Sequence, residues 1–211
     1  MKNPIWTIII VLIIGLIIGW YLPHPMPAPS AGGSMTQANL QSDMRKLWME
    51  HVAWTRMYVI AALDNAPYAD KTATRLLKNQ DDLGNAIVPY YGAGAGSQLA
   101  KLLREHIMIA AEIVTAAKKG DSAGVSAGEK KWTANADAIA TFLSGANPNW
   151  PKADLVSMLQ KHLDLTTQET VDHLKKNWDD EIATYDRIEA QALMMADALT
   201  QGIVKQFPDK F

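Results

Sequence analysis

The chain begins with an unbroken run of apolar residues. From Ile5 to Leu22 the sequence reads IWTIIIVLIIGLIIGWYL, which holds no charge and a single polar residue, a threonine. As a helix, this run would be about 27 Å long, close to the roughly 30 Å thickness of the bilayer hydrocarbon. Tryptophan and tyrosine stand near its ends, where aromatic rings favour the membrane interfaces. The pattern therefore predicts a transmembrane signal anchor over residues 1–22.

The charges on either side of this run predict its orientation. Lys2 is the only charged side chain before it, and the first Lys or Arg after it is Arg45. The positive-inside rule then places the N-terminus in the cytoplasm and the rest of the chain outside the cell membrane, as a single-pass protein. A cleaved signal peptide is the alternative, but its apolar region is normally about 7–15 residues long and ends at small residues.

The segment after the run is rich in proline and glycine. Residues 23–34, PHPMPAPSAGGS, hold four of the ten prolines of the chain and two adjacent glycines. Such a composition favours an extended, polyproline-like spacer with a flexible joint. We therefore expect a linker over residues 23–34 and an extracytoplasmic domain over residues 35–211.

Apolar residues in this domain recur at helical spacing. Only five prolines follow residue 34, and the intervals between them show no alternation typical of strands. The spacing predicts four long helices, over residues 40–61, 97–118, 121–145 and 179–206. Two shorter helical connectors are predicted over residues 69–90 and 152–176, the second restarting at a Thr166-x-x-Glu169 capping box. The pattern predicts an all-α, four-helix-type bundle of up-up-down-down topology, although an up-down-up-down order fits as well.

Composition excludes several classes of function. The chain has no cysteine, which rules out disulfides, thiolate metal sites and thiol catalysis. Twenty Lys and Arg against 22 Asp and Glu give a net charge of −2, whereas a protein that binds nucleic acid normally carries a basic excess. No nucleophile–base pattern such as G-x-S-x-G is present, so the sequence indicates no reaction and favours a non-enzymatic role.

Three histidines interrupt the apolar faces of the predicted helices. His51, His106 and His162 each occupy a position where the helical spacing calls for an apolar residue, and each follows a charged residue and precedes an apolar one. A buried imidazole needs a hydrogen-bond partner or a metal, because an unpaired polar group in the core is costly. Two interpretations follow. The histidines are buried polar residues that fix the packing of the bundle, or they form a metal or small-ligand site.

Spacing excludes the common two-metal bundles but leaves a single-ion site open. Glu-x-x-His, His-x-x-x-His and His-Glu-x-x-His are all absent. A mononuclear transition-metal site could still draw one histidine from each element, with Glu189 as a further ligand. Further residues predicted to face the polar core or a ligand are Arg56, Asp81, Asn85, Glu112, Asn135 and Tyr185.

Two of these assignments have an alternative. Asp81 and Asn85 stand one turn apart near two tyrosines, and they either line a pocket or cap the connector. The nearby glycines, from Gly92 to Gly96, superficially suggest a phosphate loop. No strand precedes them and no Lys-Ser/Thr follows, so they predict a helix end and a joint.

Five segments resemble a prokaryotic family of small helical proteins that often carry an N-terminal membrane segment. They are EHVAWTR (50–56), DLGNAIVPYYG (82–92), WTANADAIATFLS (132–144), HLDLTTQET (162–170) and MADALTQGIVKQFP (195–208). The resemblance covers nearly all of the chain after residue 40 and implies a membrane-anchored helical protein of no assigned activity. Some relatives are labelled glycosyltransferases, but this sequence has no α/β nucleotide-binding pattern and no Asp-x-Asp motif.

These observations lead to one expected function and one alternative. We expect a membrane-tethered, extracytoplasmic helical bundle that binds a metal ion or small ligand at a polar cluster around the three histidines. The alternative is a non-catalytic accessory subunit that docks on a membrane-protein partner and uses the histidines for packing.

Overall fold

The computed structural model describes residues 36–211, and the predicted anchor and linker lie outside the described residues. The chain divides into two units, residues 1–34 and 35–211. The described part is all-α. Its helices are α2 (Gln37–Leu63), α3 (Ala69–Lys118), α4 (Ser122–Ala146), α5 (Lys152–Lys175) and α6 (Trp178–Gln206), followed by the short 3₁₀ helix η1 (Pro208–Lys210). None of the helices within residues 36–211 combines the length and the apolar character needed to cross a bilayer.

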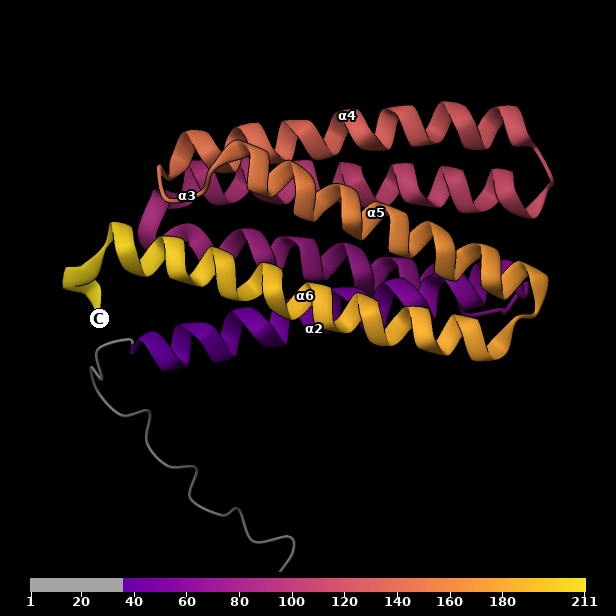
Figure 1. Cartoon of the computed structure of the whole chain (residues 1–211), viewed down its shortest axis with the longest axis horizontal. Coiled ribbons are helices and arrows are strands. Elements are labelled where there is room, and N and C mark those ends of the chain that lie inside the picture. The colour runs from indigo at the N-terminus through magenta and orange to yellow at the C-terminus, as the bar shows by residue number, and fades with distance from the viewer. Residues whose placement is uncertain (1–35) are drawn as a thin grey trace, which may run out of the picture. The chain divides into compact units, whose positions relative to one another are not determined.

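Helix α3 reverses direction at Gly92, which divides it into two arms, residues 69–91 and 93–118. Gly92 has φ 82° and ψ 166°, a conformation that glycine tolerates and other residues rarely adopt. Arg104 in the second arm donates to the carbonyl of Leu77 in the first, at 3.2 Å, so the arms run antiparallel (Figure 1). The arms can approach closely because Gly84 has no side chain. A Cβ at this position would lie only 2.5 Å from the carbonyl oxygen of Gly96. The helix end predicted near these glycines is confirmed.

The predicted four-helix arrangement with two short connectors needs correction. The first arm of α3 replaces one connector, and α5, at 24 residues, replaces the other and nearly equals the 25 residues of α4. Six helical segments therefore form the bundle, and each runs antiparallel to the next because the loops between them are short. This order also replaces the up-up-down-down topology. Helix α6 packs back against α2 and closes the ring (Figure 1).

The predicted restart within α5 is wrong, although other helix ends follow the sequence signals. Asp121 caps α4 by accepting from the backbone N–H of Gly124 at 2.9 Å. In α5, by contrast, the helix continues through Thr166, whose hydroxyl donates to the carbonyl of His162 at 2.9 Å. Glu169 does not complete a capping box, because its carboxylate pairs with Arg56 from α2.

The six segments are three copies of one helical hairpin. The first is α2 with the first arm of α3, the second is the second arm of α3 with α4, and the third is α5 with α6. One side-chain amide donates to the partner helix in the same way in each: Asn79 to Leu47 O (3.1 Å), Asn135 to Leu102 O (3.1 Å) and Gln191 to Met158 O (3.0 Å). The bonded positions repeat every 55 or 56 residues. The described domain is therefore an internal threefold repeat.

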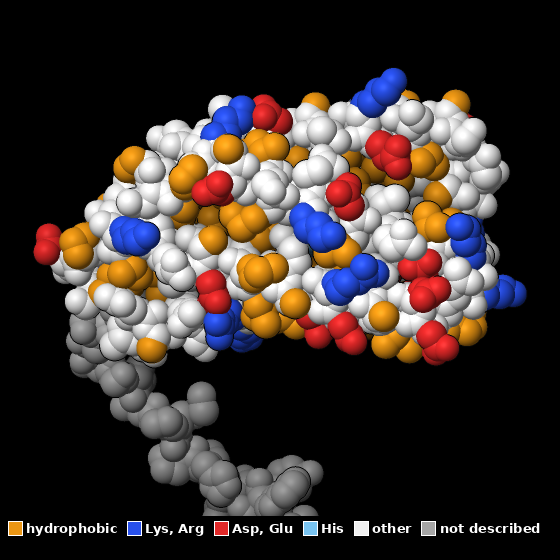
Figure 2. All heavy atoms as spheres, in the orientation of Figure 1, with side chains coloured by type: hydrophobic (Ala, Val, Ile, Leu, Met, Phe, Trp, Pro, Cys, Tyr) orange, Lys and Arg blue, Asp and Glu red, His pale blue; other side chains and the backbone are white. Residues whose placement is uncertain are grey.

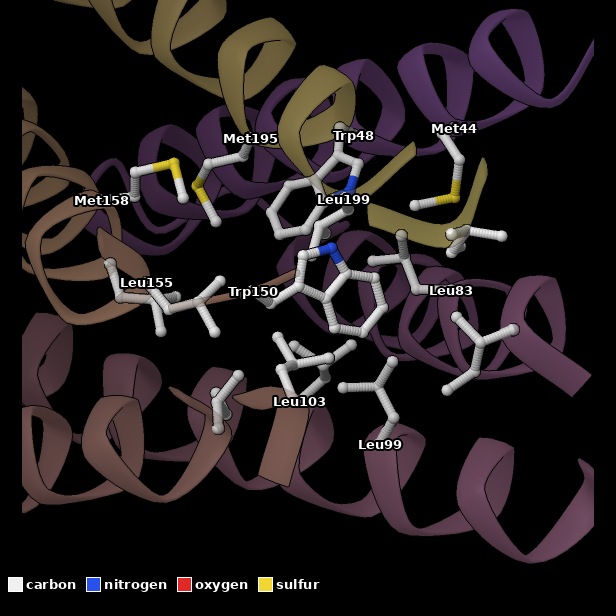
Figure 3. Close-up of a pocket in the computed structure, with 15 residues that line it drawn as sticks. Met44, Trp48, Leu83, Leu99, Leu103, Trp150, Leu155, Met158, Met195 and Leu199 are labelled. Carbon is white, nitrogen blue, oxygen red and sulfur yellow. The ribbon is translucent and has the colours of Figure 1, made fainter. Parts of the chain in front are cut away.

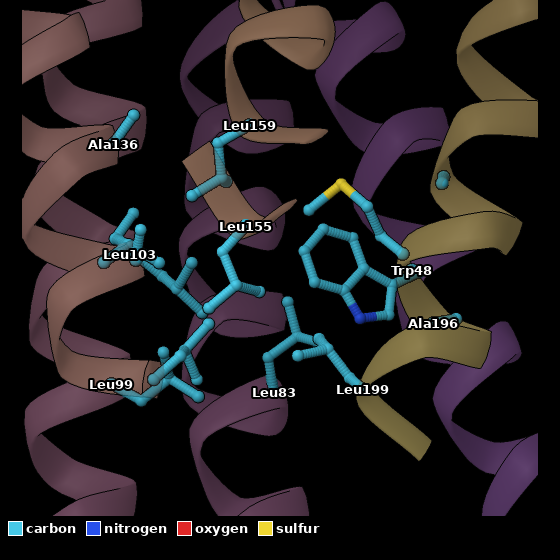
Figure 4. Close-up of a cluster of buried hydrophobic side chains, with 14 of the residues drawn as sticks. Trp48, Leu83, Leu99, Leu103, Ala136, Leu155, Leu159, Ala196 and Leu199 are labelled. Carbon is cyan, nitrogen blue, oxygen red and sulfur yellow. The ribbon is translucent and has the colours of Figure 1, made fainter. Parts of the chain in front are cut away.

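The hydrophobic core follows the same repeat. Buried residues at equivalent positions include the sets Met44, Leu99 and Leu155; Trp48, Leu103 and Leu159; Val52, Ile107 and Leu163; and Leu83, Ile139 and Met195. Figure 4 shows Trp48, Leu83 and Leu155, from three different hairpin helices, pointing toward one another. Because every hairpin buries its apolar face against the other two, the core lies along the centre of the ring.

A small cavity of about 30 Å³ lies within this core. Two of the equivalent sets, Met44, Leu99 and Leu155 and Trp48, Leu103 and Leu159, form much of its lining. Figure 3 shows the rings of Trp48 and Trp150 among the leucine and methionine side chains that line it. Trp150, from the loop between α4 and α5, packs directly on Gly202 of α6, where a Cβ would lie 1.9 Å from its Nε1. The loop tryptophan thus closes this part of the core.

Candidate functional site

The structure brings together the three histidines that the sequence singles out. His51 lies on α2, His106 on the second arm of α3 and His162 on α5, at equivalent positions of the three hairpins. All three are buried. The ring centroids of His51 and His162 are 5.5 Å apart, and those of His106 and His162 are 6.4 Å apart. They form what we call the histidine cluster, at the centre of the ring of helices.

Side-chain amides hold the histidine rings. Nδ1 of His106 lies 2.8 Å from Oδ1 of Asn135, whose Nδ2 donates to the carbonyl of Leu102. Because Oδ1 can only accept, His106 carries its proton on Nδ1 and keeps a lone pair on Nε2. Nδ1 of His51 lies 3.3 Å from Nε2 of Gln80. Gln80, Asn135 and Gln191 each follow a clustered histidine by 29 residues.

Burial keeps the histidine cluster neutral. Desolvation is the main cause that lowers the pKa of His106 to about 3 and that of His162 to about 4, and it lowers the pKa of His51 well below its usual value. The neighbouring imidazoles add to the lowering at His51 and His106, while the amides partly oppose it. Neutral imidazole is the form that binds metals.

One member of the cluster has spare hydrogen-bonding capacity. Nδ1 of His162 makes no hydrogen bond of normal geometry to any described residue, although the Gln191 amide lies close enough to raise its pKa slightly. The amide oxygens of Gln80 and Gln191 are also unpaired among the described residues. A buried polar atom without a partner is unusual in a folded protein and calls for a ligand, a water or a rearrangement.

A second polar group, the charged cluster, joins α2 to α5 and α6. Its members are Arg56, Asp64, Glu169, His173 and Glu181. Arg56 pairs with Glu169 and, through Nη2, with Oε1 of Glu181 at 2.8 Å. His173 lies between two carboxylates, with Nδ1 3.1 Å from Glu181 and Nε2 3.1 Å from Asp64. Arg56, whose side chain is 21% exposed, thus has two carboxylate partners that are almost fully buried.

The charged cluster also accounts for two further predicted residues. The guanidinium of Arg56 lies 4.7 Å from the centre of the Tyr185 ring, a cation–π contact. Burial raises the pKa of Tyr185 to about 12, and the adjacent Glu189 adds to the rise. Glu189 therefore lies beside the charged cluster and is not placed with the three histidines. Burial also raises the pKa of Glu169 to about 7, although Arg56 opposes the rise.

Three other predicted residues lie at the surface. Asp81 pairs with Arg104 at 3.1 Å and links the two arms of α3, so it neither caps a helix nor lines a core pocket. Asn85 is exposed and borders a shallow groove. Glu112 is 60% exposed and pairs with Lys131 at 3.0 Å. The expectation that these side chains face the polar core is corrected, because each occupies an outward position of its helix.

The sequence predicts Asn135 as a residue of the polar core, and the structure places it beside His106. The sequence does not point to Gln80 and Gln191 or to the acidic residues that complete the charged cluster. Gln80 and Gln191 could have been found from the common 29-residue offset after each histidine. Glu169 and Glu181 gave no such signal, because one belonged to an apparent capping box and the other to an acidic helix start. Within residues 36–211, no three His, Asp or Glu side chains are arranged to hold a metal ion as they stand.

Comparison with known proteins adds no assignment. No protein-family model matches the chain, and neither a curated protein nor a solved structure is significantly similar to it.

Proposed function

We propose that the protein binds one transition-metal ion between His51, His106 and His162. The observation that carries the proposal is the convergence of three buried histidines from equivalent positions of three hairpins. Imidazole is the commonest metal ligand among side chains and suits zinc, copper, iron and nickel. Because the chain has no cysteine, such a site would contain no thiolate, and imidazole nitrogens together with oxygen atoms would hold the ion.

The separation of the rings is close to that of a metal centre. Metal–nitrogen bonds of about 2.1 Å place the ring centroids of two bound imidazoles roughly 5 Å apart. The His51–His162 separation of 5.5 Å is near this value, whereas the His106–His162 separation of 6.4 Å is larger. Binding therefore requires the rings to close up by about 1 Å. His162 is suited to this movement because no hydrogen bond fixes its Nδ1.

The amides supply the outer support that metal-bound histidines normally have. A ligating histidine usually donates its other N–H to an oxygen, which fixes the ring orientation. Asn135 already accepts from Nδ1 of His106 in this way. At His51 the neighbouring amide is Gln80, whose Nε2 lies 3.3 Å from Nδ1 and also donates to the carbonyl of Leu76 at 2.8 Å. Gln191, at the position equivalent to Asn135, stands beside His162.

The location of this site is part of the proposal. The apolar run from Ile5 to Leu22 supports a single-pass anchor with a cytoplasmic N-terminus, and the proline-rich residues 23–34 support a spacer. We therefore place the metal-binding bundle on the extracytoplasmic side of the cell membrane.

A second candidate function is that of a non-catalytic accessory subunit. Leu174, Trp178 and Ile182 follow one another at four-residue intervals around the turn between α5 and α6, and they are 41%, 50% and 56% exposed. Exposed apolar groups that lie together mark contact sites for other proteins. A membrane-protein partner would cover them, and the histidines would then serve only the packing of the bundle.

Metal titration separates these two functions. The purified full chain, stripped of metal with a chelator, is titrated with Co²⁺ or Zn²⁺ by calorimetry. We expect one ion per chain, and a loss of affinity of about 100-fold or more in His106→Gln, because a first ligand matters at least as much as its supports. His173→Gln is the matched control, since it removes a buried histidine outside the histidine cluster. Unchanged binding in a folded His106→Gln chain would contradict the proposal and favour the accessory subunit.

A further inference from the structure

A polar surface groove of about 420 Å³ lies between α4 and α5, where α5 diverges from α4 (Figure 1). Glu129 of α4 and Asp164 of α5 are among the residues that line it, and no Lys or Arg is among the described ones. Acidic and basic side chains are interspersed over the face in Figure 2, so a groove that holds carboxylates alone is distinctive. Its volume falls within the roughly 300–1,000 Å³ of small-molecule sites.

The two carboxylates of the groove have capacity for a cation. Neither Glu129 nor Asp164 takes part in any ion pair among residues 36–211. Asp164 accepts one hydrogen bond, at 2.8 Å, from Nε2 of Gln160, another residue of the groove. A carboxylate offers about four acceptor positions, so most of those on these two side chains are open to a ligand.

Arginine side chains bridge the two other places where neighbouring hairpins meet. We call these places seams: one lies between the two arms of α3, one between α4 and α5, and one between α6 and α2. Arg104 crosses the first seam, and its guanidinium donates to the carbonyl of Leu77 at 3.2 Å. Arg56 crosses from α2 to α6, where its guanidinium lies 4.7 Å from the centre of the Tyr185 ring.

The groove lies at the corresponding place of the remaining seam. The 55- or 56-residue offset of the repeat relates these two arginines and their two partners to four residues, all of which line the groove. They are Gln160 for Arg104, Thr167 for Arg56, Thr133 for Leu77 and Glu129 for Tyr185. The seam between α4 and α5 therefore keeps the surroundings of a guanidinium but has no arginine at either position. This observation is independent of the acidic charge of the groove.

We propose that the groove between α4 and α5 binds the guanidinium group of a small cationic ligand, in the place that arginine side chains occupy at the two other seams. A guanidinium is planar and presents five donors that match carboxylates such as Glu129 and Asp164. Trp132 also lines the groove, and an indole ring attracts cations more strongly than the other aromatic groups. The proposal goes beyond the metal site and does not depend on it.

The other hollows of the described domain suit such a ligand less well. The two internal cavities, of about 30 and 60 Å³, have almost entirely apolar linings. The two remaining surface grooves contain cations of their own, which would repel a guanidinium. One is lined in part by Lys46 and Arg75 and the other by Lys205.

Calorimetric titration of the purified full chain tests the chemistry of the ligand. The probes are agmatine, which carries one guanidinium and one ammonium, and cadaverine, which carries two ammonium groups and the same charge. We expect one agmatine per chain and binding of cadaverine weaker by about tenfold, because an ammonium lacks the planar fork. No agmatine binding would overturn the site, and equal affinities would overturn the guanidinium. The tripeptide Gly-Arg-Gly should bind no tighter than agmatine, and tenfold tighter binding would replace the small ligand by an arginine of a partner protein.

A variant that supplies the missing arginine tests the place of binding. Gln160→Arg introduces a guanidinium at the position equivalent to Arg104, and it should weaken agmatine binding by about tenfold or more, because the groove is then filled from within. Gln201→Arg is the matched control, since it adds the same charge at an exposed position of α6 in a different groove. Unchanged agmatine binding in a folded Gln160→Arg chain, or an equal loss in both variants, would overturn the placement.

Removing the carboxylates tests their part in binding. Glu129→Gln combined with Asp164→Asn should weaken agmatine binding by about tenfold at low salt and by less at high salt, because salt screens the attraction. Glu112→Gln, which removes an exposed carboxylate outside the groove, should leave the affinity unchanged. A double variant that binds agmatine as tightly as Glu112→Gln would contradict the proposal.

Discussion

The histidine cluster and the charged cluster both bury polar side chains, and both join helices that are distant in the sequence. They differ in the charge of their side chains and in how those side chains are distributed over the three hairpins. The histidine cluster draws one neutral side chain from the same position of each hairpin and places an amide beside it. The charged cluster belongs to one place only: the positions equivalent to Glu169 hold Tyr58 and Ile113, and those equivalent to Glu181 hold Ala69 and Val125.

This difference indicates a division of roles. A site built from equivalent residues of three hairpins suits a central ligand that needs several equal donors, which is what a metal ion requires. The charged cluster instead connects α2 of the first hairpin to α5 and α6 of the third. It therefore fastens the two ends of the repeat to each other, where the ring of helices closes.

The largest expected effect comes from removing the only guanidinium of the charged cluster. Arg56→Met leaves Glu169 and Glu181 buried without their cation, which should lower the free energy of unfolding by about 3–5 kcal/mol. Urea unfolding followed by circular dichroism measures this. Arg45→Met, at the more exposed pair with Asp197, is the matched control and should lose much less. Equal losses in the two variants would show that the charged cluster does not close the ring.

A smaller loss is expected when the histidine cluster is changed in the absence of metal. His106→Leu deprives Oδ1 of Asn135 of its donor and should lower the free energy of unfolding by about 1–3 kcal/mol. The same urea experiment in the presence of a chelator measures it. A loss as large as that of Arg56→Met would mean that the histidines, and not the charged cluster, hold the bundle together.

The two clusters should respond to pH with opposite signs. The pKa of Glu169 is raised from 4.5 to about 7, so the folded state binds its proton more tightly than the unfolded state does. The contribution of Glu169 to stability is therefore present at acid pH and is lost as the pH rises through about 7. Glu169→Gln should gain stability relative to the parent chain as the pH rises from 4.5 to about 7, between the ordinary and the raised pKa of Glu169. Unfolding curves across this range measure the difference.

The histidine cluster provides the contrast. The pKa of His106 is lowered from 6.5 to about 3, so the unfolded state binds the proton more tightly. Its contribution to stability is complete above 6.5 and is lost as the pH falls toward 3. The metal-free parent chain should therefore lose stability on acidification relative to His106→Leu. A parallel pH dependence of the two proteins would contradict the neutral, buried state of the histidine.

Much of the fold could be predicted from the sequence because helix signals are local. The apolar spacing and the caps placed helix ends within a few residues, as at Asp121 and Gly92. The same spacing could not distinguish a connector from a full member of the bundle, because an amphipathic helix shows the same pattern in either role. The spacing therefore predicts connectors where the structure has the first arm of α3 and α5.

The candidate site, too, could be predicted from the sequence only where the signal is local. His51, His106 and His162 were recognisable because each breaks an apolar face that the helix must bury. Their amide partners lie on other helices, and only the alignment of the three hairpins connects them. The charged cluster was less visible still, since a carboxylate such as Glu169 is ordinary on a helix until the packing of α2 against α5 buries it.

X-ray absorption spectroscopy of the zinc-loaded full chain tests the central claim most directly, because it reports the atoms bound to the ion. The histidine cluster predicts a first shell with three imidazole nitrogens at about 2.0–2.1 Å, including the outer-ring scattering typical of histidine. That scattering should fall in His106→Gln and persist in His173→Gln. A shell made only of oxygens would place the ion at the carboxylates of the charged cluster or at the surface, and would contradict the account.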